Sequence, residues 1–186
     1  MHLILASASP RRAELLRAAG YTFDVVVADV DESLRPGESP SAYVRRLAAD
    51  KSAAARSSDA IVLGADTTVV VDGAILGKPR DDEDGRDMLR RLSGKTHQVL
   101  TGVSLRQGAY EVGRVESTDV VFRALTNDEL EWYVASGEGR DKAGGYAIQG
   151  LASRFIPGIS GSYANVVGLP VACLAELLRS LLASRV

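Results

Sequence analysis

A short run of serine, proline and arginine near the start of the chain has the residue types of a phosphate-binding turn. It reads Ser7-Ala8-Ser9-Pro10-Arg11-Arg12 and follows an apolar stretch. Ser9 and Pro10 are typical of a helix start, with serine as the N-cap and proline in the first turn. The two arginines are unfavourable there, because cations oppose the positive end of the helix dipole. Free N–H groups and two guanidinium groups at a helix start instead predict a phosphate site.

Three carboxylates follow two predicted strands and have the chemistry of a catalytic base and of metal ligands. Asp66 comes after a run of Ile, Val and Leu, and a carboxylate at the carboxyl end of a strand lies where α/β proteins usually place their chemistry. Asp31 and Glu32 follow the preceding strand and, together with Asp66, could share a divalent cation. Other interpretations stay open, since an Asx turn explains Asp66 and solvated loop charge explains Asp31 and Glu32.

Cations and a glycine-rich stretch complete the candidate set. Lys51 lies in an alanine-rich helix, where a lysine is ordinarily solvated, and Lys78 precedes Pro79, which can hold it at the rim of a site. Residues 143–150 combine close-approach glycines with one aromatic ring, Tyr146, and the amide of Gln149. This composition suits a wall that recognises a nucleotide base, and it suits a plain glycine-rich connection equally well.

The elements that must position these residues alternate along the chain. Apolar runs and turn residues predict strands at 3–6, 22–28, 61–64, 69–71, 74–76, 96–106 and 115–123. Caps and apolar periodicity predict helices at 11–19, 41–56, 81–92, 126–136 and 170–183. The strand at 61–64 is expected to end at Ala65-Asp66-Thr67, and Asp72-Gly73 predicts a hairpin. This alternation predicts an α/β protein with a mixed sheet and helical layers.

Composition and charge exclude several classes of protein. The 186 residues are 46% hydrophobic and 25% charged, which is enough for a core in one domain or in one domain with two joined lobes. A net charge of −2 argues against a protein that coats nucleic acid, and no apolar run is long enough to span a membrane. The opening MHLILASASPRR is too short and wrongly flanked for a secretory signal. One cysteine and two histidines argue against a disulfide framework and a zinc enzyme. The expectation is a cytoplasmic protein.

Five short blocks occur in the order that is typical of one known family. They are Ser7-Ala8-Ser9-Pro10-Arg11-Arg12, Val30-Asp31-Glu32, Gly64-Ala65-Asp66-Thr67, Gly77-Lys78-Pro79-Arg80 and Lys142-Ala143-Gly144-Gly145-Tyr146-Ala147-Ile148-Gln149-Gly150. Ser162-Tyr163 and Val167-Gly168-Leu169-Pro170 continue the series. On these blocks the chain resembles the Maf family of nucleoside triphosphate pyrophosphatases over essentially its whole length. Each block is short, but their shared order makes the resemblance specific.

The resemblance implies a fold, a reaction and partners. The fold is a single domain over residues 1–186 of the inosine-triphosphatase-like α/β type, with a mixed twisted sheet flanked by helices and two lobes around a central cleft. The reaction is hydrolysis of a nucleoside triphosphate to the monophosphate and pyrophosphate, with a divalent cation, Mg²⁺ or Mn²⁺, as cofactor. The resemblance also implies a cytoplasmic homodimer, with neither nucleic acid nor a membrane as a partner.

The resemblance also assigns roles to single residues. Asp66 matches the proton acceptor of the family, and Lys78 and Glu32 are expected to join it in catalysis. Asp66, Glu32 and Asp31 are the expected metal ligands. The residues expected to bind the substrate are Ser7, Arg11, Arg12, Lys51, Thr67 and Gln149.

Three of these positions predict which base the protein reads. In a branch of the family that acts on 7-methyl-GTP, the positions of Arg11, Thr67 and Gln149 typically carry Trp, Gln and Glu. This chain has the residues of the branch that acts on dTTP and UTP, so these two are the expected substrates, in the house-cleaning of nucleotide pools. The amide of Gln149 offers a donor and an acceptor, which match O4 and N3–H of thymine or uracil. Two alternatives stay open: a 7-methyl-GTP pyrophosphatase of the same family, and a non-catalytic nucleotide-binding inhibitor of septum formation.

Overall fold

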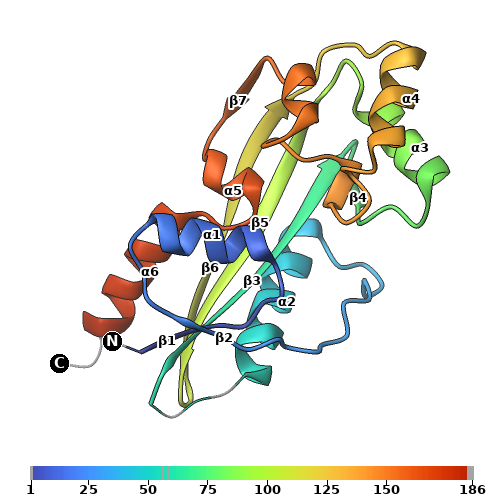
Figure 1. Ribbon diagram of the computed structural model, residues 1–186. Coiled ribbons are helices and arrows are strands. Elements are labelled where there is room, and N and C mark those ends of the chain that lie inside the picture. The colour runs from blue at the N-terminus through green and yellow to red at the C-terminus, as the bar shows by residue number, and fades with distance from the viewer. Residues whose placement is uncertain (1, 56, 58, 184–186) are drawn as a thin grey trace. The chain divides into compact units, whose positions relative to one another are not determined.

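Strands and helices alternate through the chain in the computed structural model, which describes residues 2–55, 57 and 59–183 (Figure 1). The strands are β1 (Leu3–Leu5), β2 (Asp24–Val25), β3 (Ile61–Val71), β4 (Ala74–Leu76), β5 (Thr96–Gln107), β6 (Tyr110–Val121) and β7 (Gly158–Ser160). The α-helices are α1 (Pro10–Ala18), α2 (Pro40–Ala54), α3 (Asp82–Leu92), α4 (Asn127–Ser136), α5 (Tyr163–Val167) and α6 (Val171–Ala183). Two 3₁₀-helices are η1 (Ala143–Gly145) and η2 (Leu151–Phe155). Within the described residues, none of the helices combines the length and the apolar character that a membrane span requires.

The strands form a mixed sheet. Their order in the described part of the chain is β2-β1-β3-β5-β6-β7, and β4, which is not part of this order, pairs with β3. β1 runs parallel to both β2 and β3, whereas the β3–β4 and β6–β7 pairs are antiparallel. The predicted α/β class with a mixed sheet and flanking helices is therefore confirmed, and so is the predicted β3–β4 hairpin.

The chain divides into two compact units. Unit 1 comprises Met1–Thr67, Thr101–Glu116 and Gly168–Val186, and unit 2 comprises Thr68–Leu100 and Ser117–Val167. β3, β5 and β6 each continue from the sequence of one unit into that of the other. Each unit has its own apolar core, so each is described by itself below.

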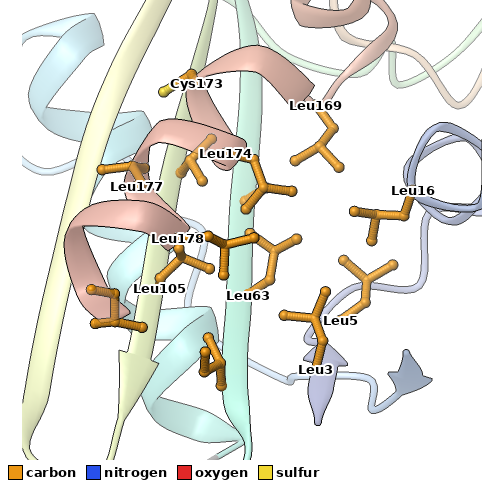
Figure 2. Packing of buried hydrophobic residues seen from close by; sticks show 14 of the residues in the cluster. Leu3, Leu5, Leu16, Leu63, Leu105, Leu169, Cys173, Leu174, Leu177 and Leu178 are labelled. Atoms are coloured by element: carbon orange, nitrogen blue, oxygen red, sulfur yellow. The ribbon is translucent and has the colours of Figure 1, made fainter. Parts of the chain in front are cut away.

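The core of unit 1 lies between the sheet and the helices α1 and α6. Alternate residues of β3 (Ile61, Leu63 and Ala65) face this core, as the period of two in a strand requires. Figure 2 shows Leu174 and Leu178 of α6 beside Leu63, with the leucines of β1 and α1 further along the same layer. Burying one such leucine side chain contributes about 1.5–3 kcal/mol. Cys173 also packs in this core.

Helix α2 packs on the other face of the β3 strand in unit 1. The approach is close: a Cβ atom on Gly64 would lie 2.1 Å from the backbone oxygen of Ala48. The hydroxyl groups of Ser52 and Ser104, from α2 and β5, are 2.8 Å apart and both residues are buried. Only glycine at position 64 allows this approach, and the approach places α2 where Lys51 can reach β3.

Unit 2 has an aromatic core that includes two polar rings. Phe122, Tyr133 and Phe155 are at most 2% exposed and pack with α3 and α4. His97 and Tyr146 lie in the same region, with 2.8 Å between the His97 Nε2 atom and the Tyr146 hydroxyl oxygen. Tyr146 is only 5% exposed, so its ring is part of the core and is not available to stack on a ligand. The sequence-based interpretation that the ring of Tyr146 forms part of a base-recognition wall is therefore wrong.

The buried imidazole of His97 makes the stability of unit 2 pH-dependent. Burial lowers the pKa of His97 to about 4, against 6.5 for the exposed group, and the charge of Asp119 opposes this shift only in part. Between these values the unfolded chain binds more protons than the folded chain, so stability is complete above pH 6.5 and is lost as the pH falls. At pH 5 we expect a loss of about 2 kcal/mol in the free energy of unfolding.

This expectation is tested by thermal unfolding of the protein at pH 7 and pH 5. The His97→Gln variant has a hydrogen-bonding group without the titration, so its melting temperature should fall less between the two pH values. His2→Gln is the matched control, because the side chain of His2 is 56% exposed. Equal pH dependence of the wild-type protein and His97→Gln would contradict the assignment to His97.

Several predicted boundaries differ from the structure. The strand predicted at 22–28 is reduced to Asp24–Val25, because β1 is short and aligns only Ile4 and Leu5 with it. The strand predicted at 61–64 does not end at Ala65-Asp66-Thr67: β3 continues unbroken to Val71. The helix α5 and both 3₁₀-helices were not predicted. Helix α2 is described as far as Ala54, and position 56, where the predicted helix ends, lies outside the described residues.

Candidate active site

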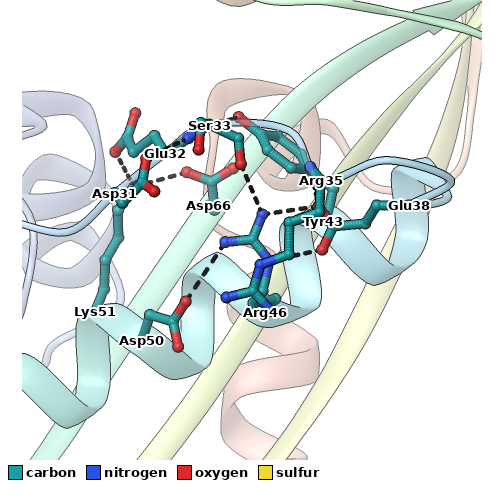
Figure 3. Close-up of polar contacts among 10 residues, drawn as sticks. All are labelled: Asp31, Glu32, Ser33, Arg35, Glu38, Tyr43, Arg46, Asp50, Lys51 and Asp66. Carbon is teal, nitrogen blue, oxygen red and sulfur yellow. Dashed lines mark hydrogen bonds and ion pairs between the residues drawn. The ribbon is translucent and has the colours of Figure 1, made fainter.

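Asp66 and Lys51 form a buried ion pair in unit 1. The Lys51 Nζ atom lies 2.7 Å from Asp66 Oδ1 and 2.6 Å from Glu32 Oε1, so one ammonium group joins two carboxylates (Figure 3). Asp66 and Lys51 are each only 8% exposed, whereas the side chain of Glu32 is 53% exposed. Lys51 is therefore not the solvated lysine that is ordinary in an alanine-rich helix. The three residues come from β3, α2 and the loop that precedes α2.

The electrostatic environment of Asp66 suits a proton acceptor. Burial raises the pKa of its carboxyl group above the usual value, and the adjacent Lys51 acts in the opposite direction. The charge of Arg12 also lowers this pKa, and that of Glu32 raises it. A carboxylate with a raised pKa is a stronger base than an exposed one, and such a balance of burial and charge is typical of active sites.

The loop that carries Glu32 is fastened to α2 by two residues that sequence reasoning missed. Arg46 donates from Nε and Nη2 to the carboxylate of Glu38, at 2.6 and 2.7 Å, and from Nη2 to the backbone oxygen of Ser33 at 3.0 Å. The hydroxyl group of Tyr43 donates to the backbone oxygen of Glu32 at 2.9 Å. Figure 3 shows both side chains reaching from the helix to this loop. Nothing in the sequence distinguishes Arg46 from a solvated helix residue, since the partners that join it to the loop, Glu38 and Ser33, lie outside the helix.

Arg12 is held from three sides within unit 1. Its Nε donates to the backbone oxygen of Gly168 at 2.9 Å, Nη1 to Ser7 Oγ at 3.0 Å and Nη2 to Thr67 Oγ1 at 3.1 Å. The Thr67 hydroxyl lies 3.0 Å from Thr101 Oγ1, and Thr101 is fully buried. Four predicted or motif residues (Ser7, Arg12, Thr67 and Gly168) are thus brought together. They fix the guanidinium group in one orientation at the start of α1.

Arg11 differs from Arg12 in its surroundings. Arg11 is only partly buried, whereas Arg12 is buried. Burial is the largest influence on the pKa of Arg12 and lowers it, and the charge of Arg11 lowers it further. Ser9 occupies the predicted N-cap position and Pro10 the first turn of α1, but the Ser9 side chain makes no capping hydrogen bond. The predicted helix start is therefore confirmed in position.

The different surroundings of the two arginines predict different consequences of their removal. Arg12→Ala removes one donor each from the Gly168 carbonyl and from the Ser7 and Thr67 hydroxyl groups, so we expect a loss of about 1–3 kcal/mol in the free energy of unfolding. Arg11→Ala should change the melting temperature little and raise KM for a nucleoside triphosphate about tenfold, as loss of a charged phosphate contact would. Thermal unfolding and steady-state kinetics of both variants are the measurements. Identical melting temperatures for the two variants would contradict a structural role for Arg12.

Three further predicted site residues are exposed. Lys78 and Gln149 belong to unit 2, and the Gly144 N–H donates to the Gly77 carbonyl at 3.0 Å, so the loop with Lys78 contacts the glycine-rich segment. Asp31, in unit 1, accepts a hydrogen bond from the Ser33 N–H at 2.9 Å.

Among the described residues, no three His, Cys, Asp or Glu side chains form a group that could hold a metal. The metal set of Asp66, Glu32 and Asp31 is therefore not assembled here, and the role of Asp31 stays a prediction.

The chain is an α/β protein with a buried ion pair that joins β3 to α2, and proteins of similar fold are known. It is similar to the structure of the Staphylococcus aureus Ham1 protein, with a TM-score of 0.54 and 14% identity over 100% of both chains. It is also similar to the structure of a HAM1 protein from Coxiella burnetii, with a TM-score of 0.52 and 12% identity over 99% of both chains. At these identities the likeness is one of fold.

The chain belongs to the Maf family: the profile described as Maf-like protein matches residues 2–181. Curated relatives named "dTTP/UTP pyrophosphatase" are similar over nearly the whole chain. The protein from Anaeromyxobacter dehalogenans is 52% identical over 95% of this chain and 92% of its own length. The protein from Symbiobacterium thermophilum is 53% identical over 95% and 92%, and that from Escherichia coli O157:H7 is 49% identical over 98% and 94%. The family expected from the sequence blocks is thus confirmed.

Proposed function

We propose that this protein hydrolyses dTTP and UTP to the nucleoside monophosphate and pyrophosphate, as a house-cleaning enzyme of nucleotide pools. The observation that carries the proposal is the buried Asp66–Lys51 pair, which holds a carboxylate of raised pKa beside cations. The names of the curated relatives, at 49–53% identity over at least 95% of this chain, support the substrates. A non-catalytic nucleotide binder would not need a carboxylate of this kind.

The cations of the site match the charge of the substrate. A nucleoside triphosphate carries about four negative charges, and the guanidinium forks and ammonium groups named below recognise phosphate oxygens well. The cations that we propose for this role are Arg11, Arg12, Lys51 and Lys78, and the hydroxyl group of Ser7 is proposed as a further substrate contact. Because the net charge of the whole chain is only −2, these cations act as a local feature and not through bulk charge.

In the proposed reaction a water oxygen attacks the α-phosphorus atom. Its bond to that atom forms as the bond from the α-phosphorus to the oxygen bridging to the β-phosphate breaks, and pyrophosphate leaves with the electron pair. Asp66 accepts the proton of the water, and Lys51, which lies 2.7 Å from Asp66 Oδ1, holds this carboxylate in place. Lys78 and the arginines offset the charge that develops on the phosphate oxygens.

The carboxylates fit a divalent cation such as Mg²⁺ or Mn²⁺. Asp66 and Glu32 converge on one ammonium group, and Mg²⁺ is typically bound by one or two carboxylates together with substrate phosphates and water. We therefore propose Asp66 and Glu32 as the residues that would hold the cation, with Asp31 as a third candidate. When bound, such a cation supplies charge neutralisation at the phosphates and activation of water.

The proposal is tested by measuring pyrophosphate release from a panel of nucleoside triphosphates with and without Mg²⁺ or Mn²⁺. We expect dTTP and UTP to give the highest kcat/KM, and chelation to remove turnover. Faster hydrolysis of 7-methyl-GTP would favour the alternative branch of the family. Nucleotide binding without any pyrophosphate release would favour the non-catalytic inhibitor of septum formation. A cytoplasmic location and a homodimer, both expected from the family resemblance, stay predictions.

A further inference from the structure

The turn that carries Gln149 is fastened at both ends by the end of one helix. The Gly150 N–H donates to the Ala147 carbonyl at 3.1 Å, which closes a four-residue turn with Gln149 at its third position. Before this turn, the Ala147 N–H donates to the hydroxyl oxygen of Tyr133 at 3.0 Å. After it, the Leu151 N–H donates to Glu138 Oε1 at 2.9 Å. Tyr133 and Glu138 thus hold the two sides of the turn.

These two anchoring side chains also hold each other. The Tyr133 hydroxyl donates to Glu138 Oε2 at 2.8 Å, so a chain of hydrogen bonds runs from Ala147 through Tyr133 to Glu138. Tyr133 is 1% exposed and lies in the last turns of α4. Helix α4 ends at Ser136 with Gly137 as its C-cap, and the carboxylate of the next residue, Glu138, lies against the Tyr133 hydroxyl. Both anchors therefore belong to one helix end and cannot move independently.

Gly150 shows that the anchoring carboxylate lies against the turn itself. A Cβ atom at this position would be 1.9 Å from Glu138 Oε1, so the carboxylate occupies the space that any other residue would fill. A side chain at position 150 would have to displace a carboxylate that accepts from Tyr133, Leu151 and, at 3.4 Å, the Ala152 N–H. Glycine at 150 and glutamate at 138 are thus coupled by space and by hydrogen bonding.

We propose that Tyr133 and Glu138 are positioning residues for base recognition, acting only through Gln149. This inference rests on the proposed function and adds to it the base contact expected from the sequence, in which the exposed amide of Gln149 recognises O4 and N3–H of the pyrimidine. An amide matches a donor–acceptor pair more often when its position is restricted, and because the side chain of Gln149 is exposed, the anchored backbone restricts it by fixing the point from which the side chain starts. Tyr133 and Glu138 lie 16 and 11 residues before Gln149 in the chain and touch neither the phosphates nor the reacting atoms in this proposal.

The test compares kcat/KM for dTTP and for dATP in Tyr133→Phe, Glu138→Gln and Gly150→Ala, each made in the wild-type chain and in Gln149→Ala. In the wild-type chain we expect the dTTP-to-dATP ratio of kcat/KM to fall about tenfold, mostly through KM for dTTP. In Gln149→Ala the same three changes should leave the ratio as it is. Gly150→Ala is included because it displaces the carboxylate without removing any polar group.

Matched controls separate positioning from general damage. Glu131→Gln alters an exposed glutamate of the same helix that pairs with Arg86, and Tyr110→Phe removes an exposed hydroxyl group. Both should leave the ratio unchanged. A second readout is amide hydrogen exchange: Tyr133→Phe should speed exchange at Ala147, and Glu138→Gln at Leu151, beyond any change in global stability.

Three results would overturn the inference: an unchanged ratio in all three variants, an equal fall in both backgrounds, or loss of kcat for dTTP and dATP alike. If the wild-type protein released no pyrophosphate from any triphosphate, the proposed function would fail. In that case the exchange experiment still shows whether the turn is anchored, so the two failures are distinguishable.

Discussion

Replacing Asp66 with asparagine is expected to lower kcat for pyrophosphate release from dTTP at least about 10²-fold, while nucleotide binding stays measurable. Asparagine keeps the shape and one acceptor oxygen for Lys51, but it cannot take the proton of the attacking water. The change also leaves the buried ammonium of Lys51 with Glu32 as its remaining carboxylate partner within 4 Å among the described residues, so some loss of stability is expected. Kinetics, nucleotide binding and thermal unfolding are therefore measured on the same preparation.

Asp50→Asn is the matched control, because it makes the same change at a partly exposed aspartate of α2 that pairs with Arg46. It should keep kcat near the wild-type value. A near-normal kcat in Asp66→Asn would show that another group takes the proton. A loss of nucleotide binding as large as the loss of kcat would show that Asp66 serves binding and not proton transfer.

The pH profile gives an independent check on Asp66. Because burial raises its pKa, the acidic limb of kcat/KM should lie at higher pH than an ordinary aspartate would give. Lys51 lowers the same pKa, so Lys51→Met should move this limb to still higher pH. A limb that does not move in Lys51→Met would contradict the coupling between the two groups.

The prediction from the sequence differs most from the structure where β3 continues through Asp66 and Thr67. Polar residues after an apolar run normally mark the end of a strand, because a buried strand cannot leave their side chains without partners. Here each polar side chain has a partner from a distant segment: Lys51 for Asp66, and Arg12 for Thr67. Local patterns do not contain these partners, so the strand was predicted to end four residues after its start. The sequence thus singles out Asp66 as a candidate from a wrong local structure, and its catalytic role stays a prediction.

The parts of the fold that were predicted well are those with local causes. Thr126 and Glu129 form a capping box at the start of α4, and Asp81 caps α3, both within four residues in the sequence. The anchors of the Gln149 turn show the opposite case. Glu138 looks like a solvated residue after a helix, and only the folded chain brings its carboxylate to the Leu151 N–H. Local propensity therefore predicts the elements, and long-range pairing decides which polar residues become a site.

The Gln149→Glu variant is expected to lower kcat/KM for dTTP and UTP by about 10²- to 10⁴-fold. The amide can donate to O4 and accept from N3–H of thymine or uracil, whereas a carboxylate only accepts. A carboxylate opposite O4 would place two acceptors against each other and leave both without a donor. Since Gln149 is exposed and lies in a turn, the change should leave the melting temperature close to that of the wild-type protein.

The measurement is kcat/KM for dTTP, UTP and 7-methyl-GTP in both proteins, because the carboxylate suits guanine where the amide suits pyrimidines. Glutamate can accept from N1–H and from the amino group of guanine, so the activity with 7-methyl-GTP should fall far less than that with dTTP, or rise. Gln107→Glu, which makes the same change in another segment of the chain, is the control and should alter neither activity. A uniform fall for all three substrates would mean that position 149 supports the site without reading the base. If instead the wild-type protein already preferred 7-methyl-GTP, the pyrimidine assignment would fail and the pyrophosphatase assignment would stand, because the roles proposed for Asp66 and Lys51 concern the triphosphate that all three substrates share.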